Sequence, residues 1–377
     1  MKKTKLMIAI SAAVLIGIVS LLVYRGQNRA ASDNVIRIGA ILPLTGAVAD
    51  DGFEAMLGVQ YAIEKINESG KTLQVKIEDG KYTPKDSISA IRKLIDEYNV
   101  DAVSVYGVVP AEALMPTVRK YRKPLVATAV GAANFPDPQL GIVRMWFPIG
   151  RLARLLGEFS LRDLKSPSIA LLCINNSYGL EAMDAFKSYY MQRNGIVSGS
   201  ETFAMDALDL RPQLSKLLEG NPNAFFVSGF GQGYITAINQ LREPGFRGAI
   251  LTDTAIVDPK VRKSIKSTDN IYYTDTCFLD ILDTNMEAAE FCSKYKMSTS
   301  LDIPSMQSQF SYVAIKLAYS LIKGGLEESL MATYADTILG EVSFNESGEI
   351  WLPIIIRYMH EGGVCETVDN ELWEEIK

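Results

Sequence analysis

The residue types that most often carry catalysis or metal binding are scarce in this chain of 377 residues. It has one histidine, His360, although histidine is the commonest general base and metal ligand at neutral pH. Histidine-based triads and multi-histidine metal sites are therefore disfavoured, and we interpret His360 as a surface residue at the end of a strand. No GxSxG motif offers a nucleophilic serine. The sequence predicts a protein that is not an enzyme and needs no cofactor or metal.

The cysteines do not form a CxxC pair, so a zinc knuckle or a thioredoxin-like redox motif is disfavoured. Cys173 lies within the apolar run 169–174, which indicates a buried strand residue. Cys277 and Cys292 are close enough along the chain to form a disulfide in an oxidising compartment. The sequence leaves open whether they are bridged.

Three loops at the ends of predicted strands could contact a ligand. Residues 42–46 (LPLTG) include Thr45, and Tyr106 and Gly107 stand where the third strand ends. Gly231 is central in the run 229–233 (GFGQG), which lacks the spacing of a dinucleotide fingerprint or a P-loop. In open α/β sheets ligands bind at the carboxyl ends of strands. Tight turns are the alternative explanation for these glycines, but we favour ligand contact because several such loops converge in this architecture.

Acidic residues do not point to one function. Asp50, Asp51 and Glu54 could form a carboxylate cluster, but acidic side chains are common in a first helical turn because they complement the helix dipole. The net charge is −6, with no basic block outside the N-terminus. Because phosphate binding requires clustered lysine and arginine, nucleic acid is excluded as a partner.

Short apolar runs alternate with amphipathic helical segments along most of the chain, which predicts parallel sheets covered by helices. The alternation occurs twice, which indicates two consecutive α/β lobes. The predicted strands are 36–42, 73–78, 102–106, 125–128, 168–174, 196–203, 224–228, 248–251, 341–344 and 350–356. The predicted helices are 52–66, 84–98, 111–121, 150–161, 179–193, 210–218, 232–241, 286–295 and 304–323.

Residues 1–33 form a separate segment. Lysines at positions 2, 3 and 5 precede an apolar stretch at 6–24, as in a secretory signal peptide or an uncleaved signal anchor. The stretch is long enough to span a bilayer, and a cleavage site after Ala31 would place Arg29 at an unsuitable position. Both interpretations stay open. Because the lysines favour a cytoplasmic N-terminus, the sequence predicts a periplasmic or extracytoplasmic protein that residues 6–24 could anchor to the inner membrane.

Several segments resemble, in order and spacing, the branched-chain amino-acid (Leu/Ile/Val) type of periplasmic binding protein. The resemblance covers about residues 35–360 and rests on the segments 36–46, 58–67, 106–107, 123–126, 134–136 and 176–179. It implies an α/β fold of two Rossmann-like lobes with parallel sheets, joined by three crossovers and closing on a ligand. The implied lobes are 34–147 plus 278–337 and 148–277 plus 338–377. The implied crossovers lie near Phe147, Tyr273–Cys277 and Thr337–Gly340.

The resemblance also implies a function and a set of ligand contacts. The function is the capture of a small molecule, an amino acid or a related compound, for an ABC permease in the membrane. Amino-acid binders hold the α-carboxylate with a serine and a threonine, and the matching positions here are near Ala111 and Asn134. Asp253 is near the position of the acidic residue that holds the α-ammonium, and Tyr178 matches a tyrosine that contacts ligand. Asp51 replaces an aromatic residue of the pocket wall.

These departures leave the ligand open. A cationic ligand is an alternative to an amino acid, given the acidic residues Asp51, Glu112 and Asp253. The full set of expected contacts is Thr45, Asp51, Tyr106, Gly107, Ala111, Glu112, Thr128, Asn134, Tyr178, Gly231 and Asp253. A membrane-tethered sensor or interaction domain of the same fold is the second functional hypothesis.

Overall fold

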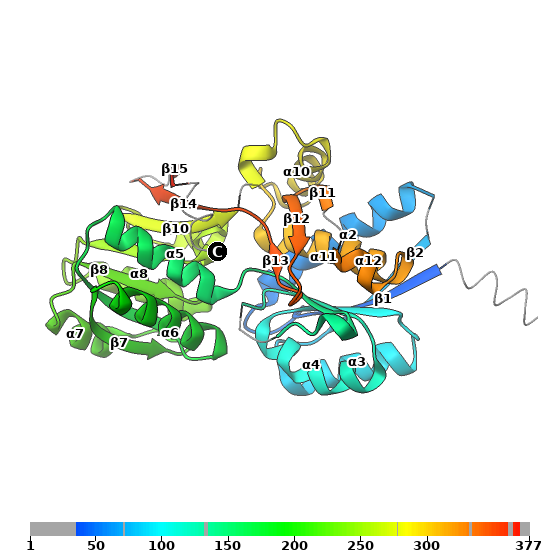
Figure 1. The fold of residues 1–377 in the computed structure, drawn as a ribbon, viewed down its shortest axis with the longest axis horizontal. Coiled ribbons are helices and arrows are strands. Elements are labelled where there is room, and N and C mark those ends of the chain that lie inside the picture. The colour runs from blue at the N-terminus through cyan, green and yellow to red at the C-terminus, as the bar shows by residue number, and fades with distance from the viewer. Residues whose placement is uncertain are drawn as a thin grey trace, which may run out of the picture.

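Two largely parallel β-sheets form the framework of the protein. The computed structural model describes residues 35–70, 72–131, 135–276, 278–331, 334–360 and 365–369. Figure 1 shows the two sheets in separate lobes, with the segments that connect them passing between. The predicted strand–helix alternation is therefore present twice.

The first sheet has five parallel strands in the order β2-β1-β3-β4-β5. Helices α2 and α11 pack together on one face and α3 and α4 on the other (Figure 1). Gly58 lets α2 approach α11 closely, since a Cβ there would lie 2.0 Å from the Ser308 carbonyl oxygen. The strands are β1 (Val35–Leu42), β2 (Thr72–Asp79), β3 (Ala102–Tyr106), β4 (Leu125–Thr128) and β5 (Ile142–Met145), and the helices are α2 (Ala49–Glu68), α3 (Pro84–Asp96), α4 (Val108–Tyr121) and α11 (Met306–Lys323).

The second sheet has seven strands in the order β15-β14-β10-β9-β8-β6-β7. Strands β6 to β10 are parallel, whereas β14 and β15 join antiparallel at one edge. Strand β8 is buried at every position, as expected for a sheet covered on both faces. The strands are β6 (Ser168–Ile174), β7 (Ile196–Phe203), β8 (Ala224–Ser228), β9 (Ala249–Thr252), β10 (Ile271–Thr276), β14 (Ile354–Met359) and β15 (Cys365–Asp369), and the helices are α5 (Ile149–Arg162), α6 (Ser177–Gln192), α7 (Arg211–Glu219) and α8 (Gly231–Arg242).

Smaller elements complete the two lobes. A three-stranded antiparallel sheet of β11, β12 and β13 packs beside β5 of the first sheet. These elements are η1 (Pro138–Leu140), η2 (Thr254–Val257), α9 (Pro259–Ser264), η3 (Phe278–Ile281), α10 (Met286–Thr299), α12 (Leu326–Met331), β11 (Tyr334–Thr337), β12 (Gly340–Phe344) and β13 (Ile350–Trp351).

The chain passes between the two large sheets three times: after β5, after β10 and between β13 and β14. The expected crossover near Thr337–Gly340 is instead a hairpin turn between β11 and β12, where Thr337 pairs with Gly340. The chain enters the seven-stranded sheet only at Ile354, after Glu349 has bridged to the buried Arg144 of β5.

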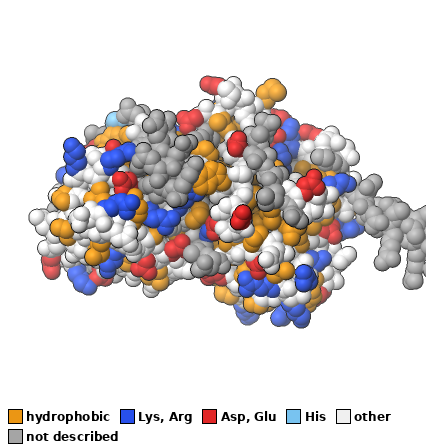
Figure 2. All heavy atoms as spheres, viewed as in Figure 1, with side chains coloured by type: hydrophobic (Ala, Val, Ile, Leu, Met, Phe, Trp, Pro, Cys, Tyr) orange, Lys and Arg blue, Asp and Glu red, His pale blue; other side chains and the backbone are white. Residues whose placement is uncertain are grey.

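Several expectations concern parts of the chain outside the described residues, namely residues 1–34 with their apolar stretch, Asn134, and Cys277. Cys292 carries a free thiol, and Cys173 is buried in β6 as predicted. Within the described ranges no helix is both long and apolar enough to cross a membrane. Positive and negative side chains are interspersed on the face shown in Figure 2.

Candidate functional site

A cleft lies between the two large sheets, at the carboxyl ends of their strands. Its first-lobe wall comes from the loops after β1 to β5, and its second-lobe wall from the residues after β6, β8 and β9. About 770 Å³ within it is free of atoms, including its open mouth. The start of α11 closes one side through Met306 and Gln307. This is the position where ligands bind in open α/β sheets.

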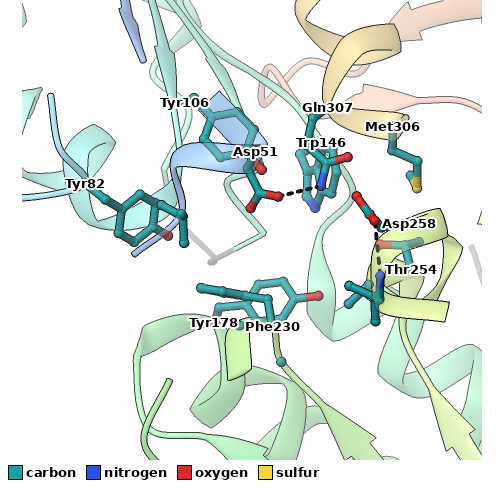
Figure 3. Close-up of a pocket in the computed structure, with 16 residues that line it drawn as sticks. Asp51, Tyr82, Tyr106, Trp146, Tyr178, Phe230, Thr254, Asp258, Met306 and Gln307 are labelled. Carbon is teal, nitrogen blue, oxygen red and sulfur yellow. Dashed lines mark hydrogen bonds between the residues drawn. The ribbon is translucent and has the colours of Figure 1, made fainter. Parts of the chain in front are cut away.

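Aromatic rings form much of the cleft wall (Figure 3). Tyr82, Tyr106 and Trp146 come from the first lobe, and Tyr178 and Phe230 from the second. The Phe230 ring meets Tyr82 edge-on across the cleft, with ring centroids 6.4 Å apart, and meets Tyr178 at 6.0 Å. These contacts hold the rings in place and give the cleft an apolar surface that a ligand body can cover.

Two carboxylates project into the same cleft from different lobes: Asp51 from the first turn of α2 and Asp258 from the start of α9 (Figure 3). Gln307 donates a hydrogen bond from Nε2 to Asp51, at 3.3 Å. Burial, together with repulsion from Asp258, raises the pKa of Asp51 to about 7. Burial also raises the pKa of Tyr106 well above its ordinary value, so this tyrosine remains a neutral donor near Asp51. Ionising Asp51 in this cleft therefore costs free energy, and a positively charged group beside it would lower that cost.

Four of the expected contact residues line the cleft: Asp51, Tyr106, Tyr178 and Gly231. Asp253 does not line it, because its carboxylate lies fully buried behind the wall. Its oxygens accept hydrogen bonds from Ser228 at 2.6 Å, Tyr178 at 3.0 Å and the backbone of Gly229 at 3.1 Å. In this structure Asp253 positions Tyr178 and the loop after β8.

Other expected contacts have structural roles away from the cleft. The exposed Thr45 donates its hydroxyl to Asp79 at 2.6 Å and so fixes the loop after β1. Ala111 lies on α4 and is fully buried in the core of the first lobe. Thr128 is buried at the end of β4 and does not reach the cleft, which is lined by its neighbour Ala129.

Glu112 lies at the rim and joins the lobes. Its carboxylate accepts a hydrogen bond from the Ser177 hydroxyl of α6 at 2.9 Å. A second rim contact pairs Lys260 of α9 with Asp50 of α2 at 3.4 Å. Both contacts connect residues of different lobes, so both depend on how closely the lobes approach.

Gly107 helps to position the cleft wall, because the ring of Tyr82 packs against its backbone. Its φ of 95° and ψ of 149° are accessible to glycine alone. A Cβ at this position would lie 2.2 Å from the Tyr82 ring. Gly107 is therefore required both by its backbone conformation and by the position of an aromatic wall residue.

We expect Gly107→Ala to lower the free energy of unfolding by about 1–3 kcal/mol from backbone strain and by a further 1–3 kcal/mol or so from overpacking against Tyr82. Gly245→Ala is the matched control, because Gly245 has a φ of 92° and no atom within 4 Å of its added Cβ. Urea denaturation of both variants measures the difference. Equal losses for the two variants would show that Tyr82 does not depend on the glycine.

The structure adds cleft residues that the sequence reasoning missed, chiefly Tyr82, Trp146, Phe230, Asp258 and Gln307. Tyr82 and Phe230 follow β2 and β8 closely, so the rule that ligands bind at strand ends could have included them. Trp146 follows β5, a strand that was not predicted. Gln307 and Asp258 begin helices and carry no local signal.

Comparisons with known proteins agree with this architecture. A family model described as periplasmic binding protein matches residues 35–327. Leu/Ile/Val-binding protein homolog 1 of Brucella suis is 22% identical over 349 residues, which cover 87% of this chain and 91% of that protein.

Solved structures are similar as well. The branched-chain amino acid transporter substrate binding protein LivJ of Streptococcus pneumoniae, in complex with isoleucine, matches with a TM-score of 0.78 at 20% identity, over 89% of this chain and 99% of LivJ. A solute binding protein of an ABC transporter from Rhodopseudomonas palustris, in complex with 3,4-dihydroxybenzoic acid, matches with a TM-score of 0.75 at 20% identity, over 89% and 98% of the two chains. These matches confirm the predicted fold class, two α/β lobes with parallel sheets.

Proposed function

Because this chain belongs to the periplasmic binding protein family, we propose that it is an extracytoplasmic solute-binding protein that delivers a small ligand to an ABC importer. The observation that carries the proposal is a cleft lined by residues of both lobes at the carboxyl ends of their strands. A ligand in such a cleft contacts both walls only when the lobes are close together. It therefore stabilises the closed form relative to the open one, and an ABC permease in the membrane can recognise that form.

The proposal includes binding without chemical transformation. The cleft offers aromatic rings and two carboxylates, and among its described lining residues there is no cysteine, histidine or lysine that could act as a nucleophile or base. In the described ranges no cluster of histidine, cysteine and acidic side chains could hold a metal. Export by residues 1–33, and anchoring by 6–24 if they are retained, are part of the same proposal.

Binding and closure can be measured together. Thermal-shift screening of the protein lacking residues 1–33 against amino acids, amines and small organic acids should give at least one ligand. Small-angle scattering with that ligand should show a smaller radius of gyration than without it. Failure of every class of solute to bind would contradict the proposal. N-terminal sequencing of the exported protein then decides whether residues 6–24 are retained.

The rim contact between Ser177 and Glu112 gives a test of closure that leaves the cleft wall and the net charge unchanged. We expect Ser177→Ala to weaken affinity for that ligand about two- to tenfold, the value of one hydrogen bond in the closed form. Ser298→Ala is the control, because its hydroxyl bonds only within α10, to Lys294 at 3.2 Å. Titration calorimetry measures both variants, and equal affinities for them would rule out a contribution of the rim contact to closure.

A further inference from the structure

Among the cleft-lining residues that the structure describes, every charged side chain is acidic. Asp51 and Asp258 line the cleft from opposite lobes, and no lysine, arginine or histidine does. Lys260, the cation whose charge acts on Asp51, does not line the cleft, and its half-exposed ammonium is paired with Asp50. A ligand that enters the cleft therefore meets a negative potential that low-dielectric walls strengthen.

The polar groups of the cleft also favour a hydrogen-bond donor as ligand. The Oε1 atom of Gln307 is buried and has no hydrogen-bond partner, while Nε2 of the same side chain is committed to Asp51. One oxygen of Asp258 accepts from the backbone of Lys260 and Val261, at 2.7 and 3.2 Å. The carboxylates and the Gln307 carbonyl oxygen are acceptors, so a ligand that brings N–H donors satisfies them and one that brings only acceptors does not.

The aromatic rings of the cleft also favour a cationic ligand. Tyr106 and Trp146 lie near Asp51 and Gln307, and Tyr178 and Phe230 lie across the cleft from them (Figure 3). The face of an aromatic ring attracts a cation, and rings that surround a desolvated site recognise ammonium groups in this way. An apolar ligand body gains from the same rings.

We propose that this cleft selects a compact organic cation, a protonated amine with an apolar body, over zwitterions and anions of the same shape. The inference rests on the proposed function, because it names the ligand class of the same cleft. It also replaces two of the three acidic residues considered from the sequence: Glu112 lies at the rim and Asp253 behind the wall, whereas Asp258 faces the ligand together with Asp51.

The test uses sets of ligands that differ in charge and share a shape. One set is 2-phenylethylamine, phenylalanine and 3-phenylpropanoate, and a second is 3-methylbutylamine, leucine and 4-methylpentanoate. A third set pairs 3,3-dimethylbutylamine with its neutral isostere 3,3-dimethylbutan-1-ol. Titration calorimetry should show, in at least one set, a cation that binds at least 100-fold more tightly than its matched partners.

Substitution of the two carboxylates assigns the effect to the cleft. Asp51→Asn and Asp258→Asn should each weaken binding of the preferred cation at least 30-fold, because asparagine keeps the shape and the hydrogen-bond acceptor but removes the charge. Asp96→Asn is the control, since Asp96 is exposed at the end of α3 and does not line the cleft, and it should change affinity less than threefold. Thermal unfolding of each variant confirms that it is folded.

The outcomes separate this inference from the proposed function. Binding of an amino acid or an anion at least as tightly as the matched amine would overturn the cation preference and leave a solute-binding protein. Binding that is insensitive to both carboxylate substitutions would overturn it as well. If no solute of any charge binds, the proposed function itself fails and the cation preference fails with it.

Discussion

Replacing Arg357 by methionine is expected to lower the free energy of unfolding by about 3–5 kcal/mol, because the change leaves a buried carboxylate without its counter-charge. Arg357 lies on β14, and its side chain is 7% exposed. Its Nε donates to Asp275 of β10 at 2.8 Å, and Asp275 is equally buried. A second nitrogen donates to the Thr367 hydroxyl of β15 at 2.7 Å. One guanidinium thus connects the last three strands at the edge of the second sheet.

The loss is expected to come from Asp275 rather than from the missing arginine contacts. The double variant Asp275→Asn/Arg357→Met removes both charges and should therefore recover part of the stability that the single variant loses. Arg211→Met is the control, since Arg211 is 60% exposed in its ion pairs with Asp209 and Glu243 and such pairs contribute about 0–1 kcal/mol. Urea denaturation measures all three. A loss below about 1 kcal/mol for Arg357→Met, or a double variant as unstable as the single, would contradict the assignment.

The ion pair of Asp275 and Arg357 shows why some strands could be predicted from the sequence and β10 could not. Strands β3, β4, β6 and β8 were predicted with the boundaries they have, because a parallel strand buried on both faces is a nearly continuous apolar run. Strand β10 was missed because Asp275 and its neighbouring threonines make its sequence look polar. Its carboxylate is balanced by Arg357, which lies 82 residues away in the chain.

Strand β5 was missed for the same reason. Its run of apolar residues is interrupted by Arg144, which is almost fully buried and bridges to Glu349. A charged residue within four positions contradicts a buried strand unless its partner is known, and here the partner lies 205 residues away. Local patterns therefore predict strands whose burial is apolar, and they miss strands whose charges are satisfied by distant segments.

The candidate site could be predicted to the level of loops, but not of side chains. Asp253 and Asp258 belong to the same connection after β9, and only a three-dimensional structure separates their roles. The carboxylate of Asp253 turns back against Ser228 and becomes buried, whereas Asp258 begins α9 one short 3-10 turn later and faces the first lobe. Which of them reaches a ligand depends on how that turn directs the chain.

Affinity for the proposed cation should depend strongly on pH, and the direction follows from Asp51. Burial, then Asp258, and more weakly Asp50 raise the pKa of Asp51 from an ordinary 3.8 to about 7, while a Tyr106 hydrogen bond and the Lys260 charge oppose the rise. A bound cation favours the ionised carboxylate, so binding below pH 7 must release a proton. Affinity is therefore expected to be constant above this pH and to fall about tenfold for each pH unit below it, approaching 100-fold at about pH 5.

The ligand-free protein should show the opposite trend for the same group. Because the folded pKa of Asp51 is raised, its protonated form stabilises the fold fully below pH 3.8, and this contribution is lost as the pH rises through about 7. Calorimetric titrations and thermal unfolding at pH 5 and 8 measure both trends, and Asp51→Asn should flatten each of them. An anionic ligand would reverse the trend in affinity, since it binds best when Asp51 is protonated. The sign of the pH dependence therefore reports the charge of the ligand, even for a ligand whose structure is unknown.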